Sequence, residues 1–289
     1  MKEIEMSGKT IIHGGGQIDG RAHTNSIEAV LNSLAAGERQ VEIDCVKLAD
    51  GFAIAHDEVE KEFYGIEKKF VAVTQAEFQQ LHVFSKYNPA TFDFISKILT
   101  IAPETKVIID AKFPDFQFVT FLQFLQRHYG EILNRLYYQI YSPSWVKICH
   151  EFGIRRTVVA LWKYFDADPL SDKAYEFASC ATSELEVLGV TVRWWSPGIT
   201  SENVHRDGIN RLAKLADVYF HGQSIPLCRE KELLHTGINF FSSYSLGSLP
   251  ERFDAQTYKK KYNDLSAMSD LCAACHFLEF GAQEGRSAV

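Results

Sequence analysis

Acidic, basic and imidazole side chains recur at the ends of short apolar runs in the first part of the chain. Glu42 and Asp44 stand two residues apart in the run QVEIDC, and Asp110 and Lys112 stand two apart in KVIIDAK. Because side chains alternate along a strand, the members of each pair share one face and the apolar residues share the other. His13 ends a third run, TIIHG. The pattern predicts buried strands with ionisable groups at their carboxyl ends.

Carboxylates this close repel each other unless a cation, a base or a shared proton intervenes. Glu42, Asp44 and Asp110 together would form an all-oxygen site, which suits Mg²⁺ or Ca²⁺ better than zinc. We expect His13 and His56 to flank this site as general acid and general base, since imidazole titrates near neutral pH. Such a group of residues suits an anionic centre with a protonatable leaving group, a description that phosphate diesters fit.

Short runs rich in β-branched and aromatic residues alternate with amphipathic stretches, which is typical of βα units and a parallel sheet. A further run, residues 52–56, follows the tight-turn dipeptide Asp50-Gly51 and predicts an extra hairpin strand. Eight βα units in about 250 residues favour a TIM-type (β/α)8 barrel over a doubly wound sheet. The eight predicted strands are residues 10–14, 40–45, 106–112, 136–142, 157–163, 189–196, 217–222 and 238–244.

The run 189–196 adds a candidate substrate contact. Arg193 and Trp195 share one of its faces, and an arginine pointing among apolar helices would be costly. That face is therefore assigned to the barrel mouth, and Trp195 is predicted to line a pocket for the alcohol portion of the substrate.

The composition is that of a globular protein, with 289 residues, 46% hydrophobic and 23% charged. The net charge of −7 argues against a nucleic-acid partner. No apolar run approaches the ~18 residues of a membrane span, and residues 1–5 are too polar for a secretory signal, so a cytoplasmic location is expected. The six scattered cysteines predict reduced core thiols rather than a disulfide framework.

The sequence changes character near residue 250, where Lys259, Lys260 and Lys261 precede a short helical pattern. We divide the chain into a barrel of residues 1–249 and a small helical C-terminal extension of residues 250–289. The extension is expected to cap the barrel or to contact a protein partner or a second copy of the chain. It is similar to short segments appended to assorted bacterial proteins through Tyr258, Tyr262, Asp264, Leu265, His276, Phe277, Gly281, Glu284, Gly285 and Arg286.

The order of the motifs resembles the glycerophosphodiester phosphodiesterase family. The resemblance covers residues 10–112 well and later residues faintly, and it implies a phosphodiesterase barrel. Its Glu42, Asp44 and a third carboxylate would hold the metal, and His13 and His56 would exchange the proton. The motifs are His13-Gly14, Asn25-Ser26-Ile27-Glu28-Ala29, Glu42-Ile43-Asp44, Asp50-Gly51 with His56-Asp57, and Asp110-Ala111-Lys112.

The chain departs from the family pattern at two positions. Gly14 stands where the family has an arginine that helps to hold the phosphate, and Asp110 stands where it usually has glutamate. In having aspartate at position 110, the chain resembles the related sphingomyelinase D-type phospholipases. We expect Lys112 or Arg21 to replace the missing phosphate contact.

These residues predict metal-dependent cleavage of a small glycerophosphodiester-like substrate, by water or by a neighbouring substrate hydroxyl. Lys112 would offset the charge that develops on the phosphate. Two alternatives remain open. In the first, the chain would be a non-catalytic phosphate-ligand-binding barrel or scaffold. In the second, it would be a Schiff-base aldolase with Lys112 as nucleophile, and this reaction would leave the carboxylates and histidines without a role.

Overall fold

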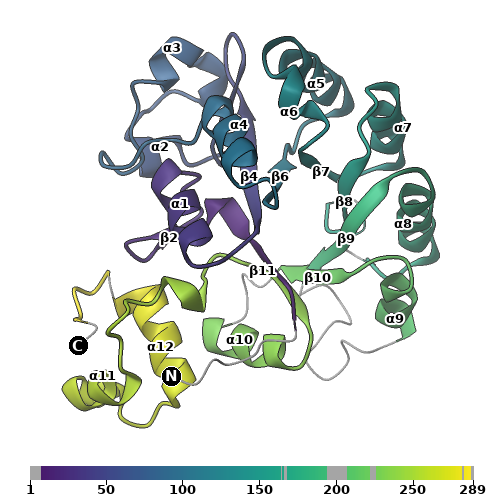
Figure 1. Cartoon of the computed structure of the whole chain (residues 1–289). Coiled ribbons are helices and arrows are strands. Elements are labelled where there is room, and N and C mark those ends of the chain that lie inside the picture. Colours follow the sequence, from purple (N-terminus) through teal and green to yellow (C-terminus); the bar gives the residue numbers. More distant parts are fainter. Residues whose placement is uncertain are drawn as a thin grey trace.

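The computed structural model describes residues 8–163, 165, 168–193, 207–221, 226–281 and 283–287. Eight parallel strands form a closed barrel in the order β1-β11-β10-β9-β8-β7-β6-β4, and pairing of β1 with β4 completes the ring (Figure 1). The predicted TIM-type barrel is thereby confirmed. Its strands are β1 (Thr10–Ile12), β4 (Gln40–Lys47), β6 (Lys106–Asp110), β7 (Tyr137–Ile140), β8 (Arg156–Ala160), β9 (Glu186–Arg193), β10 (Val218–His221) and β11 (Asn239–Ser242).

Helices surround the barrel and cover the outer faces of its strands (Figure 1). Several begin at a side chain that accepts a backbone N–H, as Ser26 does from Ala29 at 3.2 Å. The helices that follow the barrel strands are α1 (Ile27–Ala35), α4 (Phe92–Ile101), α5 (Asp115–His128), α6 (Gly130–Leu133), α7 (Pro143–Glu151), α8 (Asp172–Glu184), α9 (Asp207–Ala213) and α10 (Leu227–His235).

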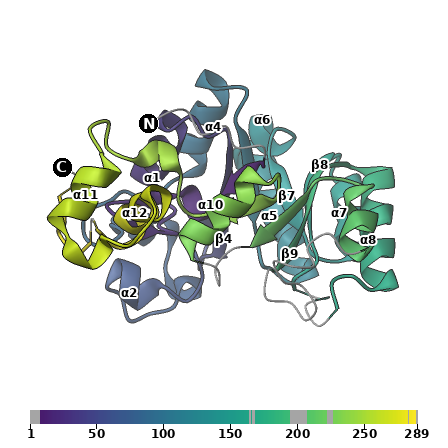
Figure 2. The ribbon, with the colours of Figure 1, turned by 90° about the horizontal axis from the view of Figure 1, so that it is seen from below.

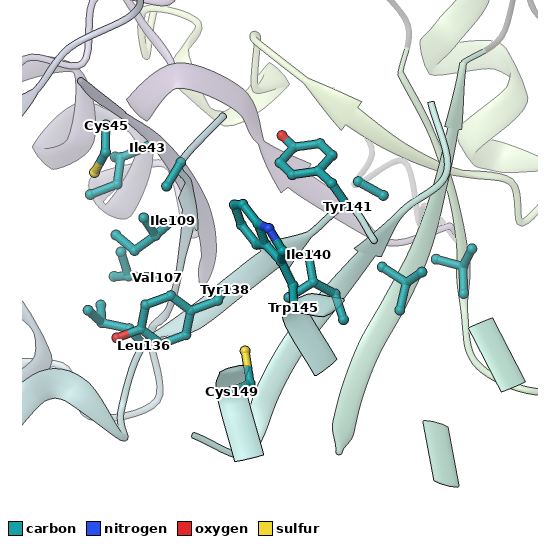
Figure 3. Close-up of a cluster of buried hydrophobic side chains, with 14 of the residues drawn as sticks. Ile43, Cys45, Val107, Ile109, Leu136, Tyr138, Ile140, Tyr141, Trp145 and Cys149 are labelled. Carbon is teal, nitrogen blue, oxygen red and sulfur yellow. The ribbon is translucent and has the colours of Figure 1, made fainter. Parts of the chain in front are cut away.

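The main apolar core lies between the barrel and these helices. Ile43 and Cys45 of β4 are buried in it, as strand alternation predicts for the residues next to Glu42 and Asp44. Figure 3 shows this core around Ile43 and Cys45 of β4, Tyr138 and Ile140 of β7, and Trp145 and Cys149 of α7. The Trp145 ring stacks on Phe118 of α5 at 3.7 Å between centroids. The opposite strand faces carry a smaller apolar cluster, which includes Ile11, Ile108 and Val158, as well as the polar residues of the site.

Most predicted runs extend past the observed strands at their polar ends. His13 lies in the 3-10 turn η1 (His13–Gly15), which follows β1, and Gly14 there has a φ of 58°. The hairpin strand β5 (Phe52–Ile54) pairs antiparallel with β4, as the Asp50-Gly51 turn predicts, and ends before His56. A second small hairpin, β2 (Gln17–Ile18) with β3 (Arg21–Ala22), has no counterpart in the sequence-based prediction.

An insertion between β5 and α4 builds a second apolar cluster beside β4. It contains α2 (Glu60–Tyr64), η2 (Phe70–Ala72) and α3 (Gln75–Phe78). Tyr64, Phe70 and Phe78 from these three elements pack with Val46 of β4. The insertion thus forms a wall beside the carboxyl end of this strand.

The residues after β11 form η3 (Leu246–Ser248), α11 (Ala255–Lys261), η4 (Asn263–Leu265), α12 (Asp270–His276) and the π-helical turn η5 (Phe277–Gly281). They lie on the side of the barrel away from α7 and α8 (Figures 1 and 2). Arg286 binds the Asp264 carboxylate with hydrogen bonds of 3.0 and 2.8 Å, and Tyr258 of α11 is buried in a cluster with Ala273 of α12. The repeated aromatic and charged residues of this segment therefore stabilise its own fold.

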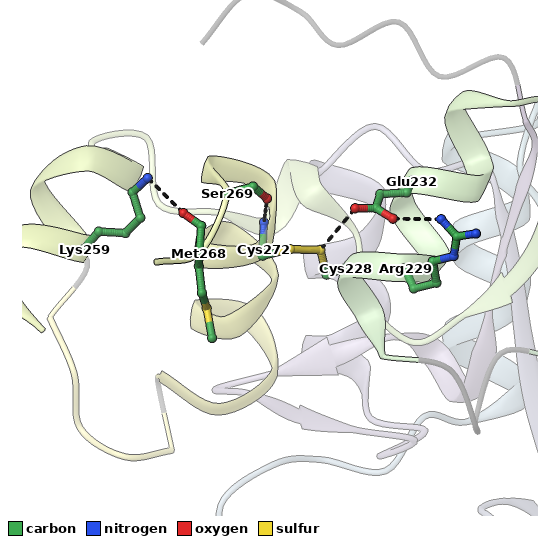
Figure 4. Close-up of a disulfide and its surroundings, with 7 residues drawn as sticks. All are labelled: Cys228, Arg229, Glu232, Lys259, Met268, Ser269 and Cys272. Carbon is green, nitrogen blue, oxygen red and sulfur yellow. Dashed lines mark hydrogen bonds and ion pairs between the residues drawn. A yellow bond between two sulfur atoms is a disulfide. The ribbon is translucent and has the colours of Figure 1, made fainter. Parts of the chain in front are cut away.

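The prediction of reduced cysteines is wrong at two positions. Cys228 of α10 and Cys272 of α12 form a disulfide bond, with Cα atoms 4.9 Å apart (Figure 4). Cys45, Cys149 and Cys275 are buried free thiols, as expected. The two bonded cysteines are 44 residues apart, and only the packing of α10 against α12 brings them together.

Among the described residues, no helix combines the length and the apolar character needed to cross a lipid bilayer.

Reducing the Cys228–Cys272 disulfide should lower the free energy of unfolding by about 2–4 kcal/mol, because the bond limits the freedom of the unfolded chain. Denaturant unfolding of the Cys228→Ser, Cys272→Ser double variant measures this change. Cys180→Ser, which alters an exposed free thiol, is the matched control and should unfold like the unsubstituted protein. Equal stability of all three proteins would contradict the bond.

Candidate active site

Three carboxylates meet where β4 pairs with β6, toward the carboxyl end of β6. One oxygen from each of Glu42, Asp44 and Asp110 lies within 4.8 Å of the other two, and all three side chains are buried. The parallel register of β4 and β6 places Asp44 directly beside Asp110. The structure therefore brings together the three predicted metal ligands.

Neighbouring groups orient these carboxylates. The Gly14 N–H donates to Glu42 Oε2 at 2.7 Å. The Asn25 side chain donates to Asp44 Oδ2 and accepts from the Asp44 N–H, both at 2.9 Å. Asn25 is a motif residue to which the sequence assigned no role. Its φ of +50° is in the left-handed region, which asparagine tolerates better than most residues.

The backbone conformation at Gly14 accounts for the absence of the family's arginine at this position. Its φ is +58°, and a Cβ atom at this position would lie 2.6 Å from the Cα atom of His23. This backbone does not admit a larger residue without a shift of the His23 segment.

Lys112 supplies positive charge to the cluster. Its ammonium group lies 3.0 Å from Asp44 Oδ1 and 3.4 Å from Asp110 Oδ2. Burial by itself would lower the pKa of Lys112, but the charges of Asp110, Asp44 and Asp57 raise it above its usual range. Lys112 is therefore a fixed cation at this site.

Glu42 keeps one oxygen atom without a partner despite the nearby Lys112. Its Oε1 atom is buried and has no hydrogen-bond partner among the described residues. Burial and the charges of Asp44 and Asp110 raise the pKa of Glu42 well above its usual value. Burial also favours a raised pKa at Asp44, but Lys112, His56 and Asn25 lower it overall. An oxygen-binding dication at this cluster would pair with the unsatisfied oxygen and relieve the repulsion, so the residues fit Mg²⁺ or Ca²⁺.

The two predicted histidines stand at the same cavity as Asp110. His13 is buried, and its Nε2 lies 3.8 Å from Glu42 Oε2. Burial, followed by the nearby His23 and other cations, lowers the pKa of His13 well below its usual value. His56 Nδ1 lies 2.6 Å from the Asp57 carbonyl oxygen, and its Nε2 lies 3.3 Å from the Lys112 ammonium. These contacts assign the proton to Nδ1 and leave Nε2 as an acceptor.

We call this space the histidine cavity. It measures about 240 Å³ and is lined by His13, His56, Asp57, Asp110, Lys112, Trp162, Arg193 and His221. Trp162 Nε1 and His221 Nε2 are buried without a hydrogen-bond partner in the described part of the chain. Arg193 lines the cavity, as strand alternation predicts, and its guanidinium lies 4.7 Å from the centre of the Trp162 ring. Trp195 lies outside the described residues.

Two histidines were not predicted as site residues. His221 ends β10 and has the same signal as His13, a polar residue at the end of an apolar run. Burial lowers its pKa to about 3. His23 follows the β2–β3 hairpin, its ring packs edge-on against His13 at 4.3 Å, and its Nε2 lies 2.9 Å from Ser243 Oγ. No strand pattern marks His23 in the sequence.

Arg21 lies away from the carboxylate cluster. Its guanidinium is 4.1 Å from the centre of the Phe84 ring, and it lines a separate cavity with Lys86 and Gln283. The hairpin that holds it is bound to the C-terminal extension, because Gln283 Nε2 donates to the Gly20 carbonyl at 2.6 Å. The structure thus leaves Lys112, and not Arg21, at the carboxylate cluster.

Comparison with known proteins identifies the fold. No protein-family model matches the sequence, and no curated protein matches it. A glycerophosphodiester phosphodiesterase structure from Agrobacterium tumefaciens matches with a TM-score of 0.56 at 16% identity, covering 93% of this chain and 99% of that one. A glycerophosphoryl diester phosphodiesterase from Parabacteroides distasonis gives 0.57 at 13%, covering 93% and 90%. A phosphodiesterase from Oleispira antarctica in complex with the product sn-glycerol-3-phosphate gives 0.56 at 15%, covering 82% and 93%. The family that the sequence resembles is thus one whose structures share this barrel.

Replacing Glu42 by glutamine should abolish stabilisation by Mg²⁺ or Ca²⁺, because the amide keeps the shape but cannot provide a charged ligand oxygen. At a metal concentration of about 100 times Kd, the unsubstituted protein should gain about 2.7 kcal/mol. Thermal unfolding with and without the metal measures the difference. Glu60→Gln, at another buried glutamate, should keep the response. An unchanged response in Glu42→Gln would exclude Glu42 as a ligand.

Metal binding should also release protons. Burial raises the pKa values of Glu42 and Asp110, so the metal-free cluster holds protons that a dication must displace. The affinity should therefore increase as the pH rises and level off once both groups are ionised. Calorimetric titration in buffers of different ionisation enthalpy counts the protons. A pH-independent affinity without proton release would show that the cluster is already ionised.

Proposed function

We propose that this protein is a metal-dependent phosphodiesterase that cleaves a glycerophosphodiester-like phosphate diester. The observation on which this rests is the buried carboxylate cluster with an unsatisfied Glu42 oxygen, which lies beside Lys112 and two histidines at one cavity. The structural likeness to glycerophosphodiester phosphodiesterases supports the same reaction.

Glu42, Asp44 and Asp110 would hold a divalent cation, Mg²⁺ or Ca²⁺. When bound, such an ion supplies Lewis-acid stabilisation of the negative charge on a phosphoryl oxygen. The ammonium of Lys112 already lies against Asp44 and Asp110 and offsets charge on the same phosphate.

His13 and His56 would exchange the proton. One histidine accepts the proton of the attacking water as its oxygen bonds to phosphorus. The other gives a proton to the alkoxide oxygen as the phosphorus–oxygen ester bond breaks. The products are a phosphate monoester and an alcohol, so every atom of the diester and the water is accounted for. The Asp57 carbonyl fixes the His56 ring with its Nε2 acceptor toward Lys112.

The polar end of the substrate would occupy the histidine cavity. Buried polar atoms without partners are costly unless a ligand completes their hydrogen bonds. Among the residues that the structure describes, Trp162 Nε1 and His221 Nε2 are two such atoms. A hydroxyl-bearing alcohol such as glycerol offers both an acceptor for the indole N–H and a donor for the imidazole nitrogen. The sn-glycerol-3-phosphate in the Oleispira antarctica enzyme supports a substrate of this kind.

The aldolase alternative is disfavoured by the charge on Lys112. A Schiff-base lysine attacks as the neutral amine, which requires a lowered pKa. The carboxylates around Lys112 raise its pKa instead. The scaffold alternative predicts no hydrolysis at all, and the activity measurement below distinguishes it.

Three further predictions remain proposals. Each of them rests on the sequence. They are the division of the chain at residue 249, the binding of a protein partner or a second copy through the extension, and a cytoplasmic location. The Cys228–Cys272 disulfide is a structural argument for an oxidising compartment in place of the cytoplasm, because reducing compartments keep such thiols free.

His13→Ala and His56→Ala should each lower kcat for a glycerol phosphodiester by about 10²–10⁴-fold, since each removes one proton transfer. Phosphorus NMR of the product measures the rate and separates a monoester from a cyclic phosphate. His150→Ala, at an exposed histidine of α7, is the control and should keep full activity.

A chelator should stop the reaction, and added Mg²⁺ or Ca²⁺ should restore it. Full activity in both histidine variants, or activity that the chelator leaves unchanged, would overturn the mechanism.

A further inference from the structure

A second cavity adjoins the histidine cavity at the barrel mouth, and we call it the outer cavity. It measures about 360 Å³ and shares Asp57, Asp110 and Lys112 with the histidine cavity. The rest of its wall comes from the end of β4, from the insertion around η2 and from the residues after β6. Lys112, the proposed phosphate contact, therefore lines both cavities.

Two charged groups on the wall of the outer cavity are already bonded within the protein. The Lys47 ammonium donates to two backbone carbonyls at 2.7 and 3.2 Å. The Glu60 carboxylate accepts from the Phe70 N–H at 3.1 Å and from the Lys69 ammonium at 3.3 Å. These charges have their partners, and the surface left to a ligand is largely that of the apolar residues.

The apolar wall of the outer cavity is held in place by packing on both sides. Phe70 lies against Tyr64 in the insertion cluster, with ring centroids 5.3 Å apart. Phe113 lies against Phe52 of the main core at 5.4 Å. Val71 on η2 lines the cavity and is 61% exposed. The cavity is thus a preformed apolar pocket between two cores, of the kind that binds small ligands.

We propose that the outer cavity binds an alkyl chain on one alcohol of the diester, so that the preferred substrates are single-chain glycerol phosphodiesters with an apolar alcohol. This inference rests on the proposed function and specifies its substrate class. The two ester oxygens of a phosphate lead to different groups, and the two cavities beside Lys112 differ in the same way. The histidine cavity offers unpartnered polar atoms, whereas the outer cavity offers Phe70, Val71 and Phe113.

The test is hydrolysis of glycerol phosphodiesters whose second alcohol is methanol, butanol, hexanol or glycerol. Each methylene that is fully buried in the cavity should raise kcat/KM by about fourfold, as expected for burial of a CH₂ group. The hexyl ester should therefore exceed the methyl ester by at least about 10-fold, even with partial burial. The glycerol ester, which is polar on both sides, should react more slowly than the butyl ester.

Val71→Asp tests the place of binding. A charge at the rim should reduce the hexyl-to-methyl ratio of kcat/KM by at least about fivefold, and its exposure means that folding is retained. Ile101→Asp, at another exposed apolar residue, is the matched control and should keep the ratio of the unsubstituted protein.

The outcomes separate the two proposals. Hydrolysis of all four esters at equal rates, or fastest hydrolysis of the glycerol ester, would overturn the alkyl site and leave the phosphodiesterase in place. A chain-length effect that survives Val71→Asp unchanged would also overturn the outer cavity as its origin. Absence of hydrolysis of every ester would overturn the proposed function and this inference with it.

Discussion

Repulsion among Glu42, Asp44 and Asp110 is the constraint to which the surrounding structure responds. Lys112 bonds two of these carboxylates, and the Gly14 N–H and the Asn25 amide bond the oxygens of Glu42 and Asp44. These contacts still leave one Glu42 oxygen without a partner in the described chain. The protein thus stabilises most of the cluster itself and leaves a deficit of positive charge, which a divalent cation would satisfy.

The register of the barrel strands determines which side chains meet at this site. Parallel pairing of β4 with β6 sets Asp44 against Asp110, and alternation sends Ile43 and Cys45 into the outer core. The short hairpin partner of β4 and the insertion after it then add an apolar wall next to the same carboxylates. This order of elements places the charged groups next to both the polar histidine cavity and the apolar outer cavity. The two cavities would suit a diester whose two alcohols differ in polarity.

Local patterns sufficed for the strands, for the hairpin at Asp50-Gly51 and for the meeting of Glu42, Asp44 and Asp110, because alternation and barrel closure determine all of them. They did not suffice where distant segments decide the geometry. His23 reaches His13 through an irregular hairpin, and Arg21 on the same hairpin is drawn toward Phe84 and the extension. The Cys228–Cys272 bond depends on helix packing, which no spacing in the sequence reports.

Closure of the barrel joins its earliest and latest strands. β1 pairs with β4 at a single position, Ile12 with Val41, but with β11 at three positions. During synthesis on the ribosome, the edge of β1 that pairs with β11 therefore stays uncovered until residues 239–242 have been made. Such long-range pairing slows folding and exposes strand edges meanwhile. His13, which directly follows β1, should accordingly reach its final position beside Glu42 only after nearly the whole barrel has been translated.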